Sequence, residues 1–466
     1  MQIPILNGIY TDQSSDFRIA YPYNLVPIPV QQGISQGYLR PADGVLQFTK
    51  DSPGVDRGGI NWNGTCYRVM GNSLVSISGT GVITTLGTIP GVGQVKFDYS
   101  FDYLAIRASE KLFLYNGTLT QITDTDLGLC VDFIWVDGYF MSTDGEFIAV
   151  TELNNPFSVL PTKYGSSESD PDPVLALLKL HNEPTAINRY TIETFSNIGG
   201  EGFPFARVDG ALISKGAVGT NACCVFMDNI AFVGCGRDES VTVYLASNGQ
   251  YSRIATREVD LQLASYTEAE ISNIKIEARV DKGNQLLYIH LPDRCLVYDG
   301  AASSLVTDKV WYVLGSGITP EEYRAKNFVW CYNKWLVGDT QSSKIGYIDT
   351  STSNHWGETI GWEFSTAIMY NDGVGAIFHE LELVCLSGRV ALGAPNPMIS
   401  TQYSLDGETW SQPKYITTGT RGECKKRLVW LQQGSMRNWR AQKFNGTTDS
   451  LLSVARLEAR LEGLMV

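Results

Sequence analysis

The sequence predicts an all-β protein: a six-bladed β-propeller with an extended N-terminal arm and a C-terminal β-sandwich-like domain. Three observations predict this class. The composition favours strands and turns, short apolar strands recur with a period of about 35 to 50 residues, and the strand pattern changes after about Trp362. At 466 residues the chain also exceeds the length of one ordinary hydrophobic core.

The composition indicates a chain rich in strands and poor in helices. Glycine is abundant (46 residues), aromatic residues make up 11% of the chain, and charged residues make up only 18%. Val, Ile, Thr and Tyr recur in short runs, as is typical of strands. We therefore expect little helix.

The extended arm is assigned to residues 1–58. Its sequence, for example "YPYNLVPIPVQQG", contains X-Pro pairs that favour extended backbone over helix. This segment is expected to be an arm or a lead-in that donates strands.

The propeller is assigned to residues 59–361. Units of two apolar strands around a short polar turn, followed by a third strand, begin near residues 65, 95, 131 and 223. The pattern appears once more at 276–300, followed by 328–349, and a doubtful sixth unit lies at 173–222. Small sheets repeated at this interval are typical of propellers. A pair of β-sandwiches is the competing explanation of the same strands.

The C-terminal β domain is assigned to residues 362–466, where five or six longer strands are expected. The last segment, "SLLSVARLEARLEGLMV", also fits helical spacing. Within it, "ARLEARLE" alternates apolar and charged residues without exception, which is the period of a half-buried strand. We predict a strand there.

The net charge of −13 argues against a chain that wraps nucleic acid, because phosphate binding requires clustered Lys and Arg. An acidic wall would still let DNA slide past. No apolar run reaches the roughly 20 residues that span a bilayer, so stable membrane insertion is not expected. The first residues lack the pattern of a signal peptide, which predicts synthesis in the cytoplasm.

The cysteines and histidines suggest no cofactor and no metal. The nine cysteines are mostly far apart and inside apolar strands, no C-x-x-C occurs, and the four histidines are isolated. We expect buried, reduced thiols. A zinc site would have to be assembled from scattered residues.

Three N-G-T triplets, at Asn63, Asn116 and Asn445, match the N-glycosylation acceptor. Because Asn-Gly is also a preferred hairpin turn, and no signal peptide is expected, all three are predicted to be hairpin tips.

The segment "YSLDGETW", Tyr403 to Trp410, is similar to the Asp-box turn of sialidase propellers. Here Gly407 follows Asp406 directly, one residue short of that motif. No pair of carboxylates is selected by spacing elsewhere, as a glycosidase would require. We predict a turn in which Ser404 and Asp406 bind the backbone and Trp410 anchors the core. No catalytic, cofactor-binding or metal-binding residue is assigned.

The surrounding sequence carries a family resemblance. An S-x-D-G-x-T-W hairpin is followed by a G-x-x-G turn (Gly419, Gly422), a basic strand into Trp430, and "GSMRNW". Near the start, "GYLRPADGV" adds a G-Y-L-R segment with a D-G turn. Together these features resemble the packaged-DNA stabilisation proteins of short-tailed bacteriophages, also called tail accessory factors or tail hubs, and more distantly nozzle proteins. Residues 165–222 match nothing in that pattern.

The resemblance implies a structural, non-enzymatic virion protein assembled in the host bacterial cytoplasm. It implies a ring, expected to be a homohexamer, below the portal and its head-to-tail adaptor. Such a ring retains packaged DNA, forms the ejection channel, docks a tail needle or plug, and carries tailspikes or tail fibres. DNA would pass through the lumen without specific binding.

Two other functions stay open at the level of the sequence. One is a propeller-type phage tail protein that binds or hydrolyses glycans, which would concentrate acidic and aromatic residues at one mouth of the propeller. The other is a scaffold protein of a cellular host.

Overall fold

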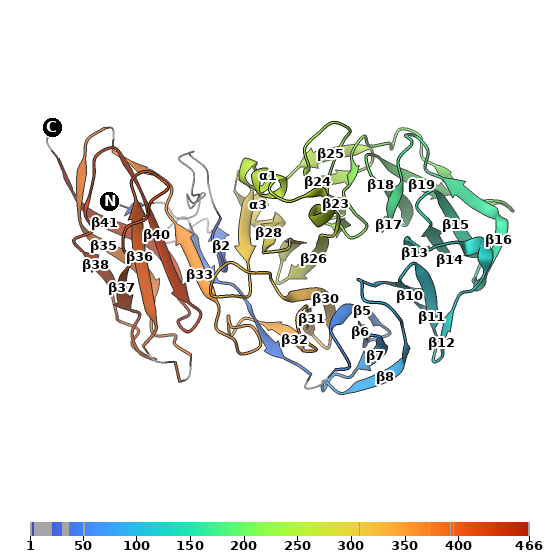
Figure 1. The fold of residues 1–466 in the computed structure, drawn as a ribbon, viewed down its shortest axis with the longest axis horizontal. Helices are drawn as coiled ribbons and strands as arrows, with labels where there is room; N and C mark the ends of the chain where they lie inside the picture. The colour runs from blue at the N-terminus through green and yellow to red at the C-terminus, as the bar shows by residue number, and fades with distance from the viewer. Residues whose placement is uncertain are drawn as a thin grey trace.

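The computed structural model describes residues 2–3, 21–29, 37–49, 52–306, 308–371, 373–391, 393–394 and 396–464. These residues form an elongated molecule with a ring of sheets at one end and a sandwich at the other (Figure 1). The helices are short: η1 (Thr125–Leu127), α1 (Arg257–Ala264), α2 (Glu268–Ser272) and α3 (Gly300–Leu305). Among the described residues, none of them has the length and apolar character needed to cross a membrane.

Within the described residues, seven antiparallel sheets form the ring, and we number them blades 1 to 7 in chain order. Blade 1 contains β5 (Asp56–Trp62), β6 (Thr65–Met70), β7 (Ser73–Ile77) and β8 (Ile83–Thr88). Blade 2 contains β9 (Lys96–Tyr99), β10 (Leu104–Ala108), β11 (Lys111–Tyr115) and β12 (Leu119–Gln121). Blade 3 contains β13 (Asp132–Val136), β14 (Tyr139–Thr143), β15 (Phe147–Glu152) and β16 (Asn155–Ser166).

The second half of the ring begins with blade 4, which contains β17 (Val174–Leu180), β18 (Glu183–Asn188), β19 (Ile192–Asn197) and β20 (Phe205–Arg207). Blade 5 contains β21 (Gly216–Ala217), β22 (Cys223–Phe226), β23 (Asn229–Cys235), β24 (Thr242–Ser247) and β25 (Gln250–Arg253). Blade 6 contains β26 (Lys275–Asp281), β27 (Asn284–His290), β28 (Cys295–Asp299) and β29 (Val310–Leu314). Blade 7 contains β30 (Ala325–Cys331), β31 (Lys334–Asp339), β32 (Ile345–Asp349) and β4 (Gly44–Gln47).

The ring is closed by contacts between inner strands. Each inner strand packs against the next, in the order β5, β9, β13, β17, β22, β26 and β30, and β30 packs against β5. Neighbouring blades share apolar cores; Val69 and Leu74 of blade 1, for example, join Leu104 and Phe113 of blade 2 in one cluster. The fold is therefore a β-propeller.

The predicted count of six blades is corrected to seven. The doubtful unit within 173–222 is a regular sheet, blade 4. The stretch from 276 to 349, which the sequence repeat predicted to be one unit, contains blades 6 and 7. Blade 7 supplies only three consecutive strands, because its fourth, β4, comes from the N-terminal segment and pairs with β32. Because its fourth strand comes from a distant part of the sequence, blade 7 is not recognised when blades are counted from consecutive strands.

The C-terminal residues form a two-layer β-sandwich. One sheet contains β2 (Leu25–Pro29), β3 (Gly37–Pro41), β41 (Ser453–Gly463), β35 (Ala376–Leu386) and β38 (Leu428–Leu431), with β1 (Gln2–Ile3) and β39 (Ser435–Met436) at its sides. The other contains β33 (Gly361–Ser365), β40 (Trp439–Thr447), β36 (Met398–Ser404) and β37 (Lys414–Thr417), with β34 (Met369–Tyr370) on β40. Phe364, Phe378, Trp430, Phe444 and Leu457 fill the core between the sheets.

Two sequence predictions about this domain are confirmed. "ARLEARLE" lies in the strand β41, which pairs along most of β35. The N-terminal segment donates strands to the same chain, since β2 and β3 join the sandwich and β4 joins the propeller.

The three Asn-Gly positions have different outcomes. Asn63 (φ 50°) and Gly64 (φ 77°) form the turn between β5 and β6, and Asn116 lies between β11 and β12, so both are hairpin tips. Asn445 is not a tip. It lies inside β40, paired on one side with Glu363 and on the other with Ser400. An isolated Asn-Gly does not force a turn where flanking strands on both sides complete the sheet.

Candidate functional site

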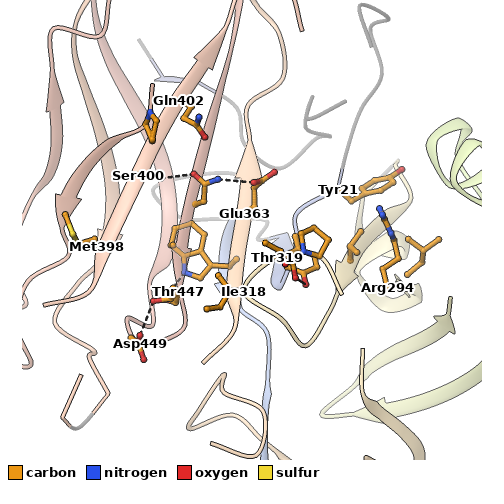
Figure 2. A pocket seen from close by; sticks show the side chains of 18 of the residues that line it. Tyr21, Arg294, Ile318, Thr319, Glu363, Met398, Ser400, Gln402, Thr447 and Asp449 are labelled. Atoms are coloured by element: carbon orange, nitrogen blue, oxygen red, sulfur yellow. Dashed lines mark hydrogen bonds between the residues drawn. The ribbon is translucent and has the colours of Figure 1, made fainter. Parts of the chain in front are cut away.

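A groove lies between the propeller and the sandwich (Figure 2). Its volume is about 1240 Å³. One wall is formed by α1, blade 6 and the loop around Ile318, and the other by β33, β40, β36 and the start of β37. The sequence predicted no site here, because the groove is created only when the two domains meet.

The floor of the groove is a backbone joint between the domains. The Tyr23 N–H donates to the Glu363 carbonyl (2.9 Å) and the Asn24 N–H donates to the Val313 carbonyl (2.8 Å). The Asn24 side chain donates to the Gly361 carbonyl (2.7 Å) and accepts from the Gly315 N–H (2.9 Å). The short segment before β2 thereby pairs with blade 6 on one side and with the sandwich on the other, which fixes the two domains together.

The tyrosines of this joint are neutral. Burial raises the pKa of Tyr21 to about 12 and that of Tyr23 to about 12. Tyr21 shares a hydrogen bond with the Thr256 hydroxyl at the start of α1. These groups anchor α1 and the joint, and neither is prepared for proton transfer near neutral pH.

The sandwich wall is a polar line across three strands. The Ser400 hydroxyl donates to the Asn445 side-chain oxygen (2.9 Å), and the Asn445 amide donates to the Glu363 carboxylate (3.0 Å). Asp449 accepts from the Thr359 hydroxyl (2.9 Å) and from the Thr447 hydroxyl (3.2 Å). Both carboxylates are therefore engaged in holding the sheet face together (Figure 2).

The propeller wall is held by an ion pair. Arg294 binds Asp293 (2.7 Å) and donates to the Gln262 side chain on α1 (3.1 Å). Although burial acts against it, this arginine, together with the Tyr266 hydroxyl, holds the pKa of the Asp293 carboxyl below its usual value. The charge remains on the carboxylate and fixes α1 against blade 6.

Exposed apolar side chains line the groove together with exposed polar residues such as Ser265, Thr319 and Asn396. Leu261, Ile318, Met398 and Tyr415 are exposed by 37%, 67%, 48% and 59%, respectively. Exposed apolar side chains around a groove are typical of a protein interaction surface. A groove that presents exposed apolar side chains among polar ones suits contact with another protein.

The propeller axis is the second candidate, and acidic side chains join successive blades there. Asp98 of blade 2 accepts from the Trp135 N–H of blade 3 (2.6 Å), and Asp132 of blade 3 accepts from the Leu177 N–H of blade 4 (2.7 Å). Glu277 of blade 6 accepts from the Asn327 N–H of blade 7 (3.0 Å). These carboxylates accept the hydrogen bonds that join neighbouring blades.

The seam where the chain closes the ring contains a buried ion pair. Arg68 of blade 1 binds Asp56 (2.9 Å) and donates to the Leu336 carbonyl of blade 7 (3.1 Å). The Asn327 amide of blade 7 donates to the same Asp56 carboxylate (2.6 Å). Blades 1 and 7 are thus joined by charge-assisted hydrogen bonds as well as by packing.

The loop Tyr403–Trp410 has the predicted turn chemistry. The Ser404 hydroxyl accepts from the Gly407 N–H (2.8 Å), and Asp406 accepts from the Glu408 and Thr409 N–H groups (3.0 and 2.8 Å). Trp410 differs from the prediction. It is only half-buried outside the core, with the Lys443 ammonium 4.6 Å from its ring centre. A cation–π contact replaces core packing there.

The described cysteines are free thiols, as predicted, and most are buried. Burial raises the pKa of Cys66 to about 11 and that of Cys130 to about 12, which leaves both unreactive. Among the described residues, no group of three or more His, Cys, Asp or Glu side chains is placed to hold a metal ion.

Comparison with known protein families gives two matches that follow the domain order. Residues 1–353 match the model described as "Bacteriophage P22 Gp10, beta-propeller", and residues 361–462 match "Bacteriophage P22 Gp10, beta-sandwich". The chain belongs to the bacteriophage P22 gp10 family. Both family descriptions agree with the propeller and the sandwich seen here.

One curated relative of this family spans the whole chain. It is the tail hub protein gp10 of Salmonella phage P22, which is 26% identical over 99% of this chain and 99% of its own length.

Solved structures with similar folds are distant. The WD40 domain of Neurospora crassa Pan2 is 10% identical over 66% of this chain and 94% of its own, with a TM-score of 0.40. The extracellular domain of BT4673 from B. thetaiotaomicron is 10% identical over 77% of this chain and 42% of its own, with a TM-score of 0.44. The fold assignment rests on the sheets of this chain and on the family match.

Proposed function

We propose that this chain is a tail hub protein of a bacteriophage and acts as a structural component of the tail. The observation that carries this proposal is the full-length match to the gp10 family with both domains in the same order. The function is structural rather than enzymatic. The alternative of a glycan-binding or glycan-hydrolysing tail protein is not better supported, since Asp406 is engaged in its own turn.

In finer detail, copies of the chain assemble into a ring, a homohexamer, below the portal and adaptor. The ring retains packaged DNA, forms the ejection channel, and docks the needle or plug and the tailspikes or fibres. It is assembled in the host cytoplasm and resides in the virion tail. The net charge of −13 supports a lumen that DNA passes without sticking. The closed blades and the joint at Asn24 support a rigid subunit.

Electron microscopy of particles made without this protein tests the function. We expect heads that lose their DNA and tails that lack every component beyond the adaptor. A plasmid-borne copy should restore both. Particles that keep their DNA and complete their tails would refute the proposal.

A further inference from the structure

The outer edge of blade 3 differs from the other blades. Its outer strand β16 is 12 residues long, whereas the outer strands of the other blades have 3 to 6 residues. β16 pairs with β15 on one side and ends the sheet on the other. A long unpaired edge strand offers backbone groups to another chain.

Apolar and acidic side chains gather at this edge around a hollow of about 390 Å³, and the one basic residue of its lining, Lys163, is paired with Glu152 (3.0 Å). Leu160 and Tyr164 of β16 line it with Phe147 of β15, and these three are exposed by 43%, 56% and 36%. Asp126 and Asp144 line the same hollow and are exposed. Neither forms an ion pair with a described residue. We call these five residues the distal patch.

The sandwich carries the opposite charge at the far end of β35. The loop after β35 lies against the loop between β37 and β38, since the Gly422 N–H donates to the Gly388 carbonyl (2.9 Å). Arg389, Arg421 and Lys425 project from these two loops as exposed residues without an ion pair to a described residue. Leu386, exposed by 66%, lies beside them. We call these four residues the basic tip; Glu423 is the one acid in its loops.

The two surfaces belong to opposite ends of the molecule. In Figure 1, β16 lies at one end of the long axis and the sandwich lies at the other. A single chain whose domains are fixed at the Asn24 joint cannot bring these ends together, but two copies can. A chain with a net charge of −13 that still concentrates at one tip three cations without an ion pair to a described residue suits an acidic acceptor on another copy.

We propose that the basic tip of one copy docks on the distal patch of the next, so that copies join head to tail. Leu386 packs against Leu160 and Tyr164, while Arg421 and Lys425 face Asp126 and Asp144. Contacts between different surfaces of identical chains close into a ring when the rotation between copies allows it. This inference rests on the ring of the proposed function and assigns its subunit interface.

Charge reversal tests the interface in the purified full-length chain. Arg421→Glu/Lys425→Glu reverses the tip, and Asp126→Lys/Asp144→Lys reverses the patch. Each double variant should weaken self-association by at least about 100-fold, because like charges then face each other. Sedimentation and native mass spectrometry measure the assembly, and circular dichroism verifies folding. Asp102→Lys/Lys282→Glu, which alters exposed charges on blades 2 and 6, is the matched control and should assemble normally.

Mixing the two reversed variants gives the sharper outcome. Each reversed tip then meets a reversed patch, so an equimolar mixture should form rings in which the variants alternate. One chain carrying all four reversals should assemble alone. If both double variants still form rings, or if the mixture stays monomeric, the proposed interface is contradicted. Neither result contradicts the ring itself. A wild-type chain that is monomeric at every concentration also contradicts the proposed interface. The hub function is tested separately by electron microscopy of particles made without this protein.

Cross-linking supplies a second readout that does not depend on charge. Cys424 is exposed in the loop of the basic tip, and Glu146→Cys adds a thiol beside the distal patch. A short bis-maleimide should join copies of this variant into a ladder of multimers. Asp102→Cys is the control and should give no ladder. Equal ladders from both variants would refute the docking.

Discussion

Asn24 controls the joint between propeller and sandwich, and its removal should loosen that joint. Its side chain is 1% exposed and makes two hydrogen bonds, to Gly361 and from Gly315. Asn24→Gly leaves a buried carbonyl and a buried N–H without partners, at about 1 to 3 kcal/mol each. The expected loss of stability at the joint is therefore about 2 to 6 kcal/mol.

Comparison with Asn24→Ala separates the backbone from the hydrogen bonds. Asn24 has a φ of 53°, in the left-handed region that glycine adopts freely and alanine does not. Asn24→Ala should therefore cost a further 1 kcal/mol or so beyond Asn24→Gly. A smaller loss in the alanine variant would contradict the backbone argument.

Hydrogen exchange measured by mass spectrometry reports this loss locally. The amides of Val313, Gly315 and Glu363 should exchange faster in both variants, while those of blades 2 and 3 stay at the wild-type rate. Wild-type protection at Gly315 in Asn24→Gly would refute the proposed joint.

Three further predictions concern the closing seam, pH and the Asp406 loop. Arg68→Met leaves the Asp56 carboxylate buried and lacking its cation, so the free energy of unfolding measured in urea should fall by about 3 to 5 kcal/mol. A fall of less than about 1 kcal/mol would contradict a stabilising role for this ion pair between blades 1 and 7. Burial lowers the pKa of His355 from 6.5 to about 4, so its neutral form stabilises the fold fully above pH 6.5. That contribution, up to about 3 kcal/mol, disappears as the pH falls from about 6.5 to about 4, and urea unfolding of His355→Gln should show a weaker acid dependence than wild type. Hydrogen bonds from Thr409 and Glu408 hold the pKa of Asp406 well below its usual value. Asp406→Ala should therefore speed amide exchange at Glu408 and Thr409 with the melting temperature unchanged, and unchanged exchange there would contradict the turn chemistry.

Local patterns predicted much of this fold. The alternation in "ARLEARLE" identified β41, and the turn residues identified the hairpin at Asn63, because both signals act over a few neighbouring residues. The turn at Ser404 to Gly407 was predicted for the same reason. The family resemblance followed from short motifs near the two ends of the chain, each of which spans only a few neighbouring residues.

Features that depend on distant residues were not predictable in this way. The seventh blade is completed by β4, which lies about 300 residues before β32 in the sequence. The repeat of consecutive strands therefore predicted six blades. Asn445 is a strand residue because Glu363 and Ser400 flank it across the sheet. The groove, the joint at Asn24 and the buried pair of Arg68 and Asp56 exist only after the domains and blades have met. Trp410 was misplaced because its partner, Lys443, comes from β40 and not from the loop that contains Trp410.

Electron cryomicroscopy of the intact phage tail tests the central claim most directly. We predict a ring of copies of this chain between the adaptor and the distal end of the tail, each copy with a seven-bladed propeller and a sandwich, around a continuous channel. A complete tail whose ring is built from another protein would contradict the assignment of this chain as the hub.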